Sequence, residues 1–193
     1  MLKIWTMKTK EAAAEKKKPK TSAAQIRVQK DLGELEIPST IKLEFPDPAD
    51  ILNLNVTITP DEGDGSEDYL KADTFFSPGF YTGGHFKFTF AINNNYPHEP
   101  PKVHCVQKIY HPNIDLEGNI CLNILREDWK PVLSLHSVLV GLQYLFLEPN
   151  ADDPLNKEAA KDLMQDRRSF ESNVRRLLAG GSFRDEVYDN VLG

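Results

Sequence analysis

The chain has 193 residues, of which 40% are hydrophobic and 27% are charged, and its formal net charge is −6. This length fits one domain with attached segments, and its two cysteines exclude a disulfide-rich secreted scaffold or a multi-cysteine zinc module. Residues 1–20 carry +5, from seven lysines and two glutamates, which leaves −11 on the rest of the chain. Because binding to nucleic acid requires neutralisation of phosphates, such an acidic body argues against a nucleic-acid partner.

The basic segment 1–20 is predicted to be a flexible extension that docks to a partner. Residues 8–20 are rich in Lys, Ala and Glu without an apolar stripe, which is typical of disorder. Before them lies an apolar cluster in which Trp5 either packs on its own domain or anchors the segment in a partner's groove. No apolar run has the length of a signal peptide or a membrane span, so we expect a cytoplasmic and nuclear protein without a membrane partner.

The pattern after this extension predicts one helix followed by strands. Ser22 and Gln25 form a capping box, and the helix that they begin is expected to end at Pro38. Apolar and polar residues then alternate over residues 41–45, 52–58 and 86–92, and a shorter strand spans residues 103–105. Because these strands follow one another with turn-like breaks between them, they predict an antiparallel meander.

The remaining segments are an inserted loop and a helical C-terminal part. Residues 64–79, with no assigned function, are predicted to be an insertion. Three helices are expected: a buried one from 137 to 147, one opening at 155 or 156, and an amphipathic one over 167–179 that stops at two glycines. This order of elements predicts an α+β fold with an N-terminal docking extension (1–20), a core domain (21–182) and a C-terminal tail (183–193).

The residues suggest chemistry at Cys121, although a lone cysteine is often a small buried hydrophobe. No Ser/His/Asp triad is evident, and no two of the five histidines lie at a helical metal-ligand spacing. A thiolate can hold an acyl group as a thioester, and the amide of the nearby Asn113 can donate a hydrogen bond to a developing oxyanion. Cys105 lies on an alternating strand and is interpreted as a core residue.

Several motifs occur together in the central part of the chain. Tyr-x-Gly-Gly-x-Phe at 81–86, Tyr-Pro-x-x-Pro-Pro at 96–101, His-Pro-Asn at 111–113, Gly-x-Ile-Cys-Leu at 118–122 and Trp-x-Pro at 129–131 follow in this order. Their order and spacing resemble the catalytic core of ubiquitin-conjugating enzymes over roughly residues 22–180. The resemblance implies the fold of that family: an N-terminal helix, a four-stranded antiparallel meander and C-terminal helices.

The resemblance also implies the roles of individual residues. Cys121 would accept a ubiquitin-like modifier as a thioester, and Asn113 would either stabilise the oxyanion or order its loop. Asp153 would orient the incoming lysine and assist its deprotonation, which is needed because free lysine has a pKa of about 10.4. Asp153 and Asp152 could equally cap the following helix.

Further residues are expected to support this cleft. His111 is assigned a structural role in preference to acid–base catalysis, and Tyr110 and Leu155 are expected to line the cleft. The resemblance implies no metal and no bound cofactor, since ATP is consumed upstream by the activating enzyme.

Local sequence narrows the choice of ubiquitin-like modifier. Residues 111–119, 122–133, 142–150 and 153–160 closely resemble the neddylation-conjugating branch of the family, whose N-terminal peptide docks on a dedicated activating enzyme. Ile4, Trp5 and Met7 stand at the positions of that peptide, although Trp5 and Met7 depart from the usual Phe and Leu. The partners implied are the neddylation activating enzyme, its ubiquitin-like modifier, cullins, and a RING-type ligase with its co-ligase.

Surface positions follow from the same resemblance. Met1 and Leu2 would present an acetylated N-terminus to the co-ligase. Arg27 and Lys30 would contact the activating enzyme. The ligase would face His98, Pro131 and Val132. The alternatives are a ubiquitin-conjugating enzyme of the same fold and, less favoured, an inactive binding variant or a thiol hydrolase.

Overall fold

The computed structural model describes residues 21–60 and 79–193. Its elements, in chain order, are α2 (Ala23–Gly33), β1 (Ile41–Glu44), β2 (Asn53–Ile58), β3 (Phe86–Ala91), β4 (Lys102–Cys105), the 3₁₀ helix η1 (Asn123–Leu125), α3 (Leu135–Leu147), α4 (Lys157–Gln165), α5 (Arg167–Leu178), β5 (Ala179–Phe183) and β6 (Glu186–Asn190). The predicted α+β class is confirmed, and the predicted docking residues 1–20 and nearly all of the predicted insertion lie outside the described residues.

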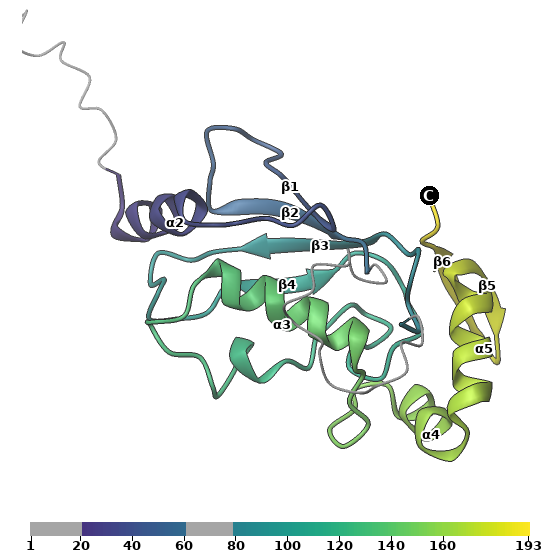
Figure 1. Ribbon diagram of the computed structural model, residues 1–193. Coiled ribbons are helices and arrows are strands. Elements are labelled where there is room, and N and C mark those ends of the chain that lie inside the picture. Colours follow the sequence, from purple (N-terminus) through teal and green to yellow (C-terminus); the bar gives the residue numbers. More distant parts are fainter. Residues whose placement is uncertain (1–20, 61–78) are drawn as a thin grey trace, which may run out of the picture.

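The four strands β1 to β4 form one antiparallel sheet in chain order, as the alternating pattern predicted (Figure 1). Strand β3 shows why: Phe86, Phe88 and Phe90 are buried, whereas Lys87 and Thr89 between them lie on the opposite face. Because successive side chains of a strand point to opposite faces, this alternation gives the sheet one apolar face and one polar face.

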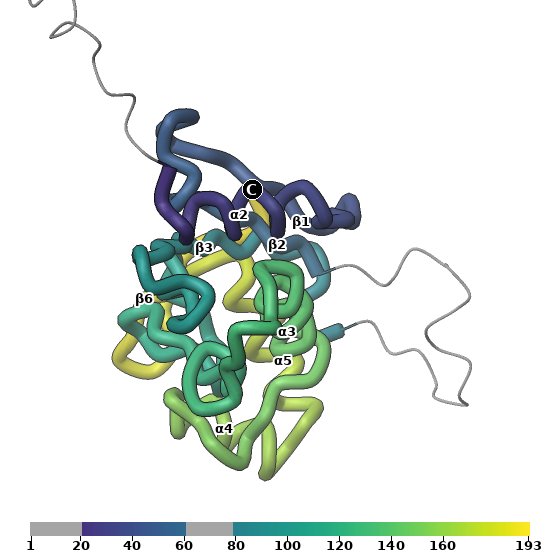
Figure 2. Tube along the Cα trace, turned by 90° about the vertical axis from the view of Figure 1, so that its left-hand side faces the viewer, coloured from purple at the N-terminus to yellow at the C-terminus, as the bar shows by residue number. Residues whose placement is uncertain are grey.

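Helix α3 covers the apolar face of this sheet (Figure 1). Its Phe146 stacks on Phe86 with ring centroids 4.2 Å apart, and it meets Phe88 edge-on at 6.1 Å. Figure 2 shows the resulting order, with α2 and the first strands above α3 and with α4 below it. The core therefore lies between the sheet and α3.

The prediction that residues 137–147 form a buried helix differs from the structure in two respects. The helix begins two residues earlier, at Leu135, because Ser134 serves as its N-cap in a capping box with Ser137. In addition, Val140, Tyr144 and Leu147 are exposed, since only one side of α3 faces the sheet. A nearly continuous apolar sequence therefore did not mean that every side of this helix is buried.

Helix α2 begins as predicted and ends earlier than predicted. The capping box of Ser22 and Gln25 is present in full, with the Gln25 amide N–H donating to the Ser22 hydroxyl at 3.1 Å. The last helical residue is Gly33, not a residue adjoining Pro38. Glycine is a poor helix former, so the helix ends at Gly33, before Pro38.

Residues 183–193, predicted to be a tail, belong to the packed core instead. Strand β6 pairs with β5, so Gly180 and Gly181 lie within a strand after the end of α5. Tyr188 and Val191 are buried, and the Val191 carbonyl accepts a hydrogen bond from the His85 amide at 2.7 Å. These long-range contacts fix the segment.

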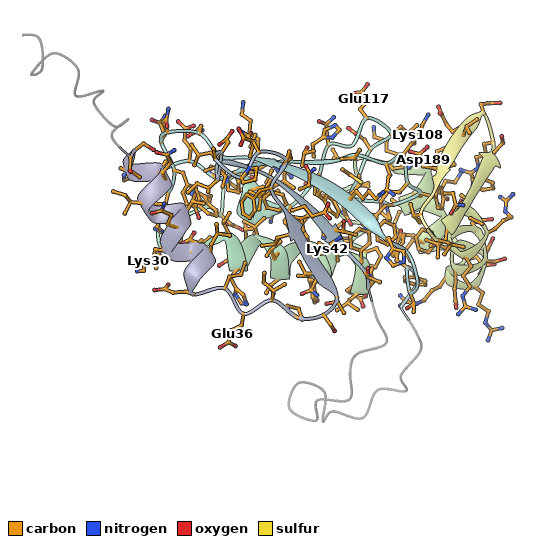
Figure 3. The ribbon with its side chains drawn as sticks, turned by 90° about the horizontal axis from the view of Figure 1, so that it is seen from above. Lys30, Glu36, Lys42, Lys108, Glu117 and Asp189 are labelled. Atoms are coloured by element: carbon orange, nitrogen blue, oxygen red, sulfur yellow. The ribbon has the colours of Figure 1, made fainter. Side chains whose placement is uncertain are left out.

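The C-terminal hairpin is also held at its outer edge. The backbone N–H of Lys108 donates to the Asp189 carboxylate at 2.7 Å, and the Asp189 N–H donates to the Lys108 carbonyl at 3.0 Å. Figure 3 shows these two residues side by side, and Asp189 belongs to β6. The hairpin is therefore connected to the segment that follows β4.

A tight turn at Gly118 packs against the end of β4. Gly118 has a φ of 87°, and its carbonyl accepts a hydrogen bond from the Cys105 amide at 2.9 Å. A Cβ atom at this position would lie 2.1 Å from the Cys105 carbonyl oxygen and 2.6 Å from the His104 ring. Both the backbone conformation and the close approach therefore require glycine.

We expect Gly118→Ala to lower the free energy of unfolding by about 3 kcal/mol or more, because the side chain meets backbone in a left-handed conformation. Urea unfolding followed by circular dichroism measures this. Gly33→Ala is the matched control, since its Cβ would meet nothing within 4 Å in a helix. Equal stability of the two variants would contradict the steric argument.

Candidate active site

Cys121 lies in a folded loop that leads from β4 toward η1. Isolated bridges pair His111 with Ile114 and Ile114 with Ile120, so the chain doubles back on itself here. The Cys121 amide donates to the Asn113 carbonyl at 2.8 Å, and the residue is only 7% exposed. The cysteine is thus fixed beside the His-Pro-Asn segment, outside any regular element.

Two charged side chains contact the Cys121 sulfur. The thiol donates to Asp153 Oδ2 at 3.2 Å, and Arg126 Nη2 donates to the sulfur at 2.7 Å. Arg126 Nη2 also lies 3.3 Å from Asp153 Oδ2, so the three groups form a triangle. Asp153 therefore lies next to Cys121, as expected. The contact between Arg126 and the sulfur was not predicted.

The environment of the thiol determines its protonation. Burial is the main cause that raises the pKa of Cys121, and the hydrogen bond to Asp153 raises it further. The positive charge of Arg126 acts in the opposite direction. By contrast, burial raises the pKa of Cys105 to about 12, and this thiol, which donates to the Gln107 carbonyl, is a core residue. Of the two cysteines, Cys121 is the one that contacts a cation, and a neighbouring cation favours the thiolate, which is the nucleophilic form.

His111 is fully buried and bonded through both ring nitrogens. Its Nε2 lies 3.0 Å from the Leu145 carbonyl, and its Nδ1 accepts from the Asn113 amide at 2.9 Å. The ring also packs on Tyr81 and Phe146. Because both nitrogens are engaged away from the cysteine, this geometry fits the structural role that was predicted for His111.

The side chain of Asn113 joins the cysteine loop to the loop after α3. Its amide nitrogen donates to the Asn150 carbonyl at 2.8 Å, and its amide oxygen accepts from the Asn150 N–H at 2.9 Å. Both amide groups are therefore bonded to one residue of backbone. Of the two roles considered for Asn113, this arrangement favours ordering of the loops.

The loop after α3 carries Asp153 to the cysteine. Its path is fixed by the Pro112 carbonyl, which accepts from the amides of Leu155 at 3.0 Å and Asn156 at 2.9 Å. Asn156 is the N-cap of α4, so neither Asp152 nor Asp153 performs the capping role that was the alternative for them. Leu155 is exposed on this loop.

The expectation that Tyr110 lines the cleft is wrong. Its ring is buried, packs against Phe183 and Tyr188, and its hydroxyl donates to Asp162 of α4. Tyr110 therefore fastens the C-terminal hairpin and α4 to the chain just before His111. It supports the site from the core side.

The predicted partner-facing residues lie at the α2 end of the molecule. Val132 is 83% exposed, Pro131 and His98 are exposed, and Lys30 projects from α2 into solvent (Figure 3). Arg27 is engaged within the chain, because it donates to the carbonyls of Pro131 at 2.8 Å and Leu133 at 2.6 Å. Such bonds hold α2 to this loop.

A buried carboxylate completes this end of the fold. Asp31 accepts from Arg27 at 2.7 Å, from the Tyr96 hydroxyl, and from the Leu135 amide at 3.2 Å. The Trp129 indole N–H donates to the Pro97 carbonyl at 2.8 Å. These bonds connect α2, the proline-rich loop and the start of α3 in one network.

Some predicted site residues are not placed by the structure, and some functional neighbours were not predicted. The N-terminal docking residues lie outside the described residues: Met1, Leu2, Ile4, Trp5 and Met7. Arg126 and Asn150 were not predicted as site residues. Only the fold shows that the charge of Arg126 approaches Cys121 and that the backbone of Asn150 approaches Asn113. The sequence signals available for them were that Arg126 follows the cysteine by five residues and that Asn150 belongs to the Pro-Asn pair at 149–150.

Neither a metal cluster nor a membrane span is found in the part of the chain that the structure describes. No group of three or more His, Cys, Asp or Glu side chains in residues 21–60 and 79–193 could hold a metal ion. No helix in the same ranges has the length and apolarity needed to cross a membrane.

The meander sheet, the crossing helix α3 and a cysteine beside His-Pro-Asn agree with a comparison of the sequence with protein families. Residues 27–178 match the ubiquitin-conjugating enzyme family, and the chain belongs to that family. It is 58% identical over 193 residues to the NEDD8-conjugating enzyme UBC12 of Yarrowia lipolytica, covering 100% of this chain and 99% of the relative.

Two further relatives agree. The NEDD8-conjugating enzyme ubc12 of Schizosaccharomyces pombe is 54% identical over 192 residues, with 100% of this chain and 99% of the relative covered. The solved structure of S. cerevisiae Ubc12 superposes with a TM-score of 0.79 at 43% identity, covering 98% of this chain and 97% of that one. The resemblance inferred from the motifs is therefore confirmed.

The buried His111 predicts a pH dependence of stability. Burial lowers its pKa to about 4, whereas an unfolded histidine titrates near 6.5, so between these values the unfolded chain binds more protons. The free energy of unfolding should therefore fall as the pH falls through this window, by about 2 kcal/mol at pH 5 from this residue.

Urea unfolding at pH 7 and pH 5 measures this contribution. His111→Gln should show a fall between the two pH values that is smaller by about that amount. His136→Gln, at an exposed position on α3, should keep the full fall. A full fall in His111→Gln would contradict the assignment of a buried neutral imidazole.

Proposed function

We propose that this chain accepts NEDD8 from its activating enzyme as a thioester on Cys121 and transfers it to a lysine of its substrate. The observation that carries the proposal is the triangle of Cys121, Asp153 and Arg126. The relatives quoted above, named as NEDD8-conjugating enzymes over nearly their whole length, support the choice of modifier.

Loading is a thiol exchange. The Cys121 thiolate attacks the carbonyl of the modifier's C-terminal residue, the new C–S bond forms, and the thiol of the activating enzyme leaves. The proton of the Cys121 thiol has a local acceptor, since Asp153 Oδ2 lies 3.2 Å from the sulfur. The ATP-dependent step belongs to the activating enzyme, and the exchange itself calls for no metal or bound cofactor, because the thioester is already activated.

Transfer replaces the sulfur by an amine. The lysine nitrogen attacks the thioester carbonyl, the C–S bond breaks with its electron pair on sulfur, and the amine loses a proton. Asp153, exposed at the edge of the site, is placed to orient the amine and accept this proton. Asn113 holds the loop that carries Asp153, through its two bonds to Asn150.

The partner surfaces follow from the same proposal. The N-terminal residues Ile4, Trp5 and Met7, with Lys30 on α2, serve the activating enzyme. A RING-type ligase faces His98, Pro131 and Val132, which are exposed at one end of the molecule. Met1 and Leu2 serve the co-ligase, cullins are the substrates, and the protein acts in the cytoplasm and nucleus.

Charging assays test the proposal. The chain incubated with NEDD8, ATP and the NEDD8 activating enzyme should form an adduct that a thiol reductant removes. Cys121→Ala should form none, and Cys121→Ser should form a more stable oxyester. Cys105→Ser, which can keep the hydrogen bond to the Gln107 carbonyl, is the matched control and should charge normally.

The alternatives predict other results. Charging by the ubiquitin system alone would identify a ubiquitin-conjugating enzyme of the same fold. A chain that charges with neither modifier would be a binding variant, and an adduct on Cys121→Ala would overturn the assignment of the acyl carrier.

A second prediction concerns Asn113. Asn113→Ala removes both bonds to Asn150, so the loop that carries Asp153 loosens. We expect transfer to free lysine to slow roughly tenfold or more, and charging to slow less. Single-turnover discharge of the preformed adduct measures the first, and initial charging rates measure the second. Asn119→Ala, an exposed asparagine in the same loop, should behave as the parent chain.

Hydrogen exchange separates the two roles of Asn113. If it orders the loop, the amides of residues 149–156 should exchange faster in Asn113→Ala. Slow transfer with unchanged exchange would instead favour donation to the oxyanion, and equal loss of charging and transfer would contradict both.

A further inference from the structure

Arg126 reaches back from the end of η1 to the reacting sulfur. Its backbone N–H donates to the Asn123 carbonyl at 2.9 Å, which closes the turn of η1. From this fixed backbone its Nη2 atom lies 2.7 Å from Cys121 Sγ. The guanidinium is therefore a direct contact of the atom that the proposed reaction acylates.

The same nitrogen contacts the neighbouring carboxylate. Arg126 Nη2 lies 3.3 Å from Asp153 Oδ2, which itself lies 3.2 Å from the sulfur. If Cys121 loses its proton, the thiolate and the Asp153 carboxylate become two negative charges in contact. Two like charges at this distance strongly disfavour ionisation of one of them, unless a positive charge lies between them.

Arg126 supplies that positive charge. Among the described residues, the charged groups in contact around Cys121 are Arg126, from the turn after η1, and Asp153, from the loop after α3. One further carboxylate, Glu127, lies 3.9 Å from Arg126 Nε. Arg126 is the cation of this group, and it touches both partners.

We propose that Arg126 is a catalytic residue that stabilises negative charge on the Cys121 sulfur next to Asp153. The proposal rests on the proposed function of Cys121 as the acyl carrier. During loading, the guanidinium stabilises the thiolate that attacks the modifier's carbonyl. During transfer, the C–S bond breaks, the electron pair returns to sulfur, and the same guanidinium stabilises the leaving thiolate.

This role explains how Asp153 can serve the lysine without suppressing the thiol. In the thioester, the sulfur is neutral and a weak acceptor, so the guanidinium is left with Asp153 as its charged partner. When the thiolate is released, the positive charge again has two negative neighbours. The Arg126 side chain is 45% exposed, so solvent screens its effect, and we expect changes of several-fold.

The pH dependence of alkylation tests the proposal without any modifier. The full chain is treated with iodoacetamide from pH 6 to about pH 11.5, a range that extends above the raised midpoint of this thiol, and modification of Cys121 is followed by peptide mass spectrometry. Because the thiolate is the reactive form, Arg126→Gln should shift the midpoint to higher pH and slow alkylation near neutral pH by about three- to tenfold. At a pH well above both midpoints the two rates should converge.

Two further variants give opposite expectations. Asp153→Asn should shift the midpoint to lower pH, since it removes the negative neighbour. Arg126→Lys keeps the charge and loses the planar fork, so it should restore part of the parent midpoint. Arg168→Gln, an exposed arginine at the start of α5, is the matched control and should leave the profile unchanged.

Unchanged midpoints in Arg126→Gln would overturn the proposal, and so would an upward shift in Asp153→Asn. A merely structural role of Arg126 would change stability, so urea unfolding is measured in parallel and should change little at this exposed side chain. Charging and discharge rates of Arg126→Gln should fall by a factor similar to that of alkylation. If neither modifier formed an adduct on Cys121, the proposed function would be wrong. The alkylation profile would still test whether Arg126 stabilises the thiolate.

Discussion

A buried imidazole connects the hydrophobic core to the cysteine loop, and the geometry of the site depends on it. The His111 ring packs against Tyr81 and Phe146, and its Nε2 atom lies 3.0 Å from the Leu145 carbonyl of α3. Its other nitrogen accepts from the Asn113 amide, so the position of α3 determines where that backbone lies. Asn113 then binds Asn150 and, through its carbonyl, the Cys121 amide. The order of the core is transmitted to the sulfur by a short series of hydrogen bonds.

The chemistry of the site is a balance of charges around a poorly solvated sulfur. Burial and Asp153 both favour the protonated thiol, while Arg126 favours the thiolate. A thiol held mainly in its neutral form resists adventitious oxidation and alkylation, since the thiolate is the reactive species. In the proposed mechanism, the carboxylate that makes the thiol less acidic is also the group that assists the attacking lysine. In our proposal, the positive charge of Arg126 allows the thiolate and the Asp153 carboxylate to act side by side.

Much of the fold could be predicted from local patterns. The alternation of Phe86, Phe88 and Phe90 located β3 and its buried face, and the pair Ser22 and Gln25 located the start of α2. These features depend on residues a few positions apart. The burial of Tyr188 and the place of Tyr110 depend on contacts between distant segments, so no periodicity could reveal them.

The site shows the same division. Cys121, Asn113 and Asp153 could be named because their motifs resemble those of a family. Arg126 could not be assigned a role from its sequence position, because its side chain could point in several directions. The contact with sulfur exists only because η1 turns the chain back toward the loop after α3.

The network around Asp31 has a consequence for molecular recognition. It bonds α2, Tyr96 and the first residue of α3 to one carboxylate, while Arg27 fastens α2 to the carbonyls of Pro131 and Leu133. The backbone beneath this exposed surface is already ordered before any partner arrives. A partner that docks here therefore immobilises only surface side chains, and the entropy lost on association is small for the area covered. Binding at such a surface leaves the backbone that lies between it and the sulfur in place.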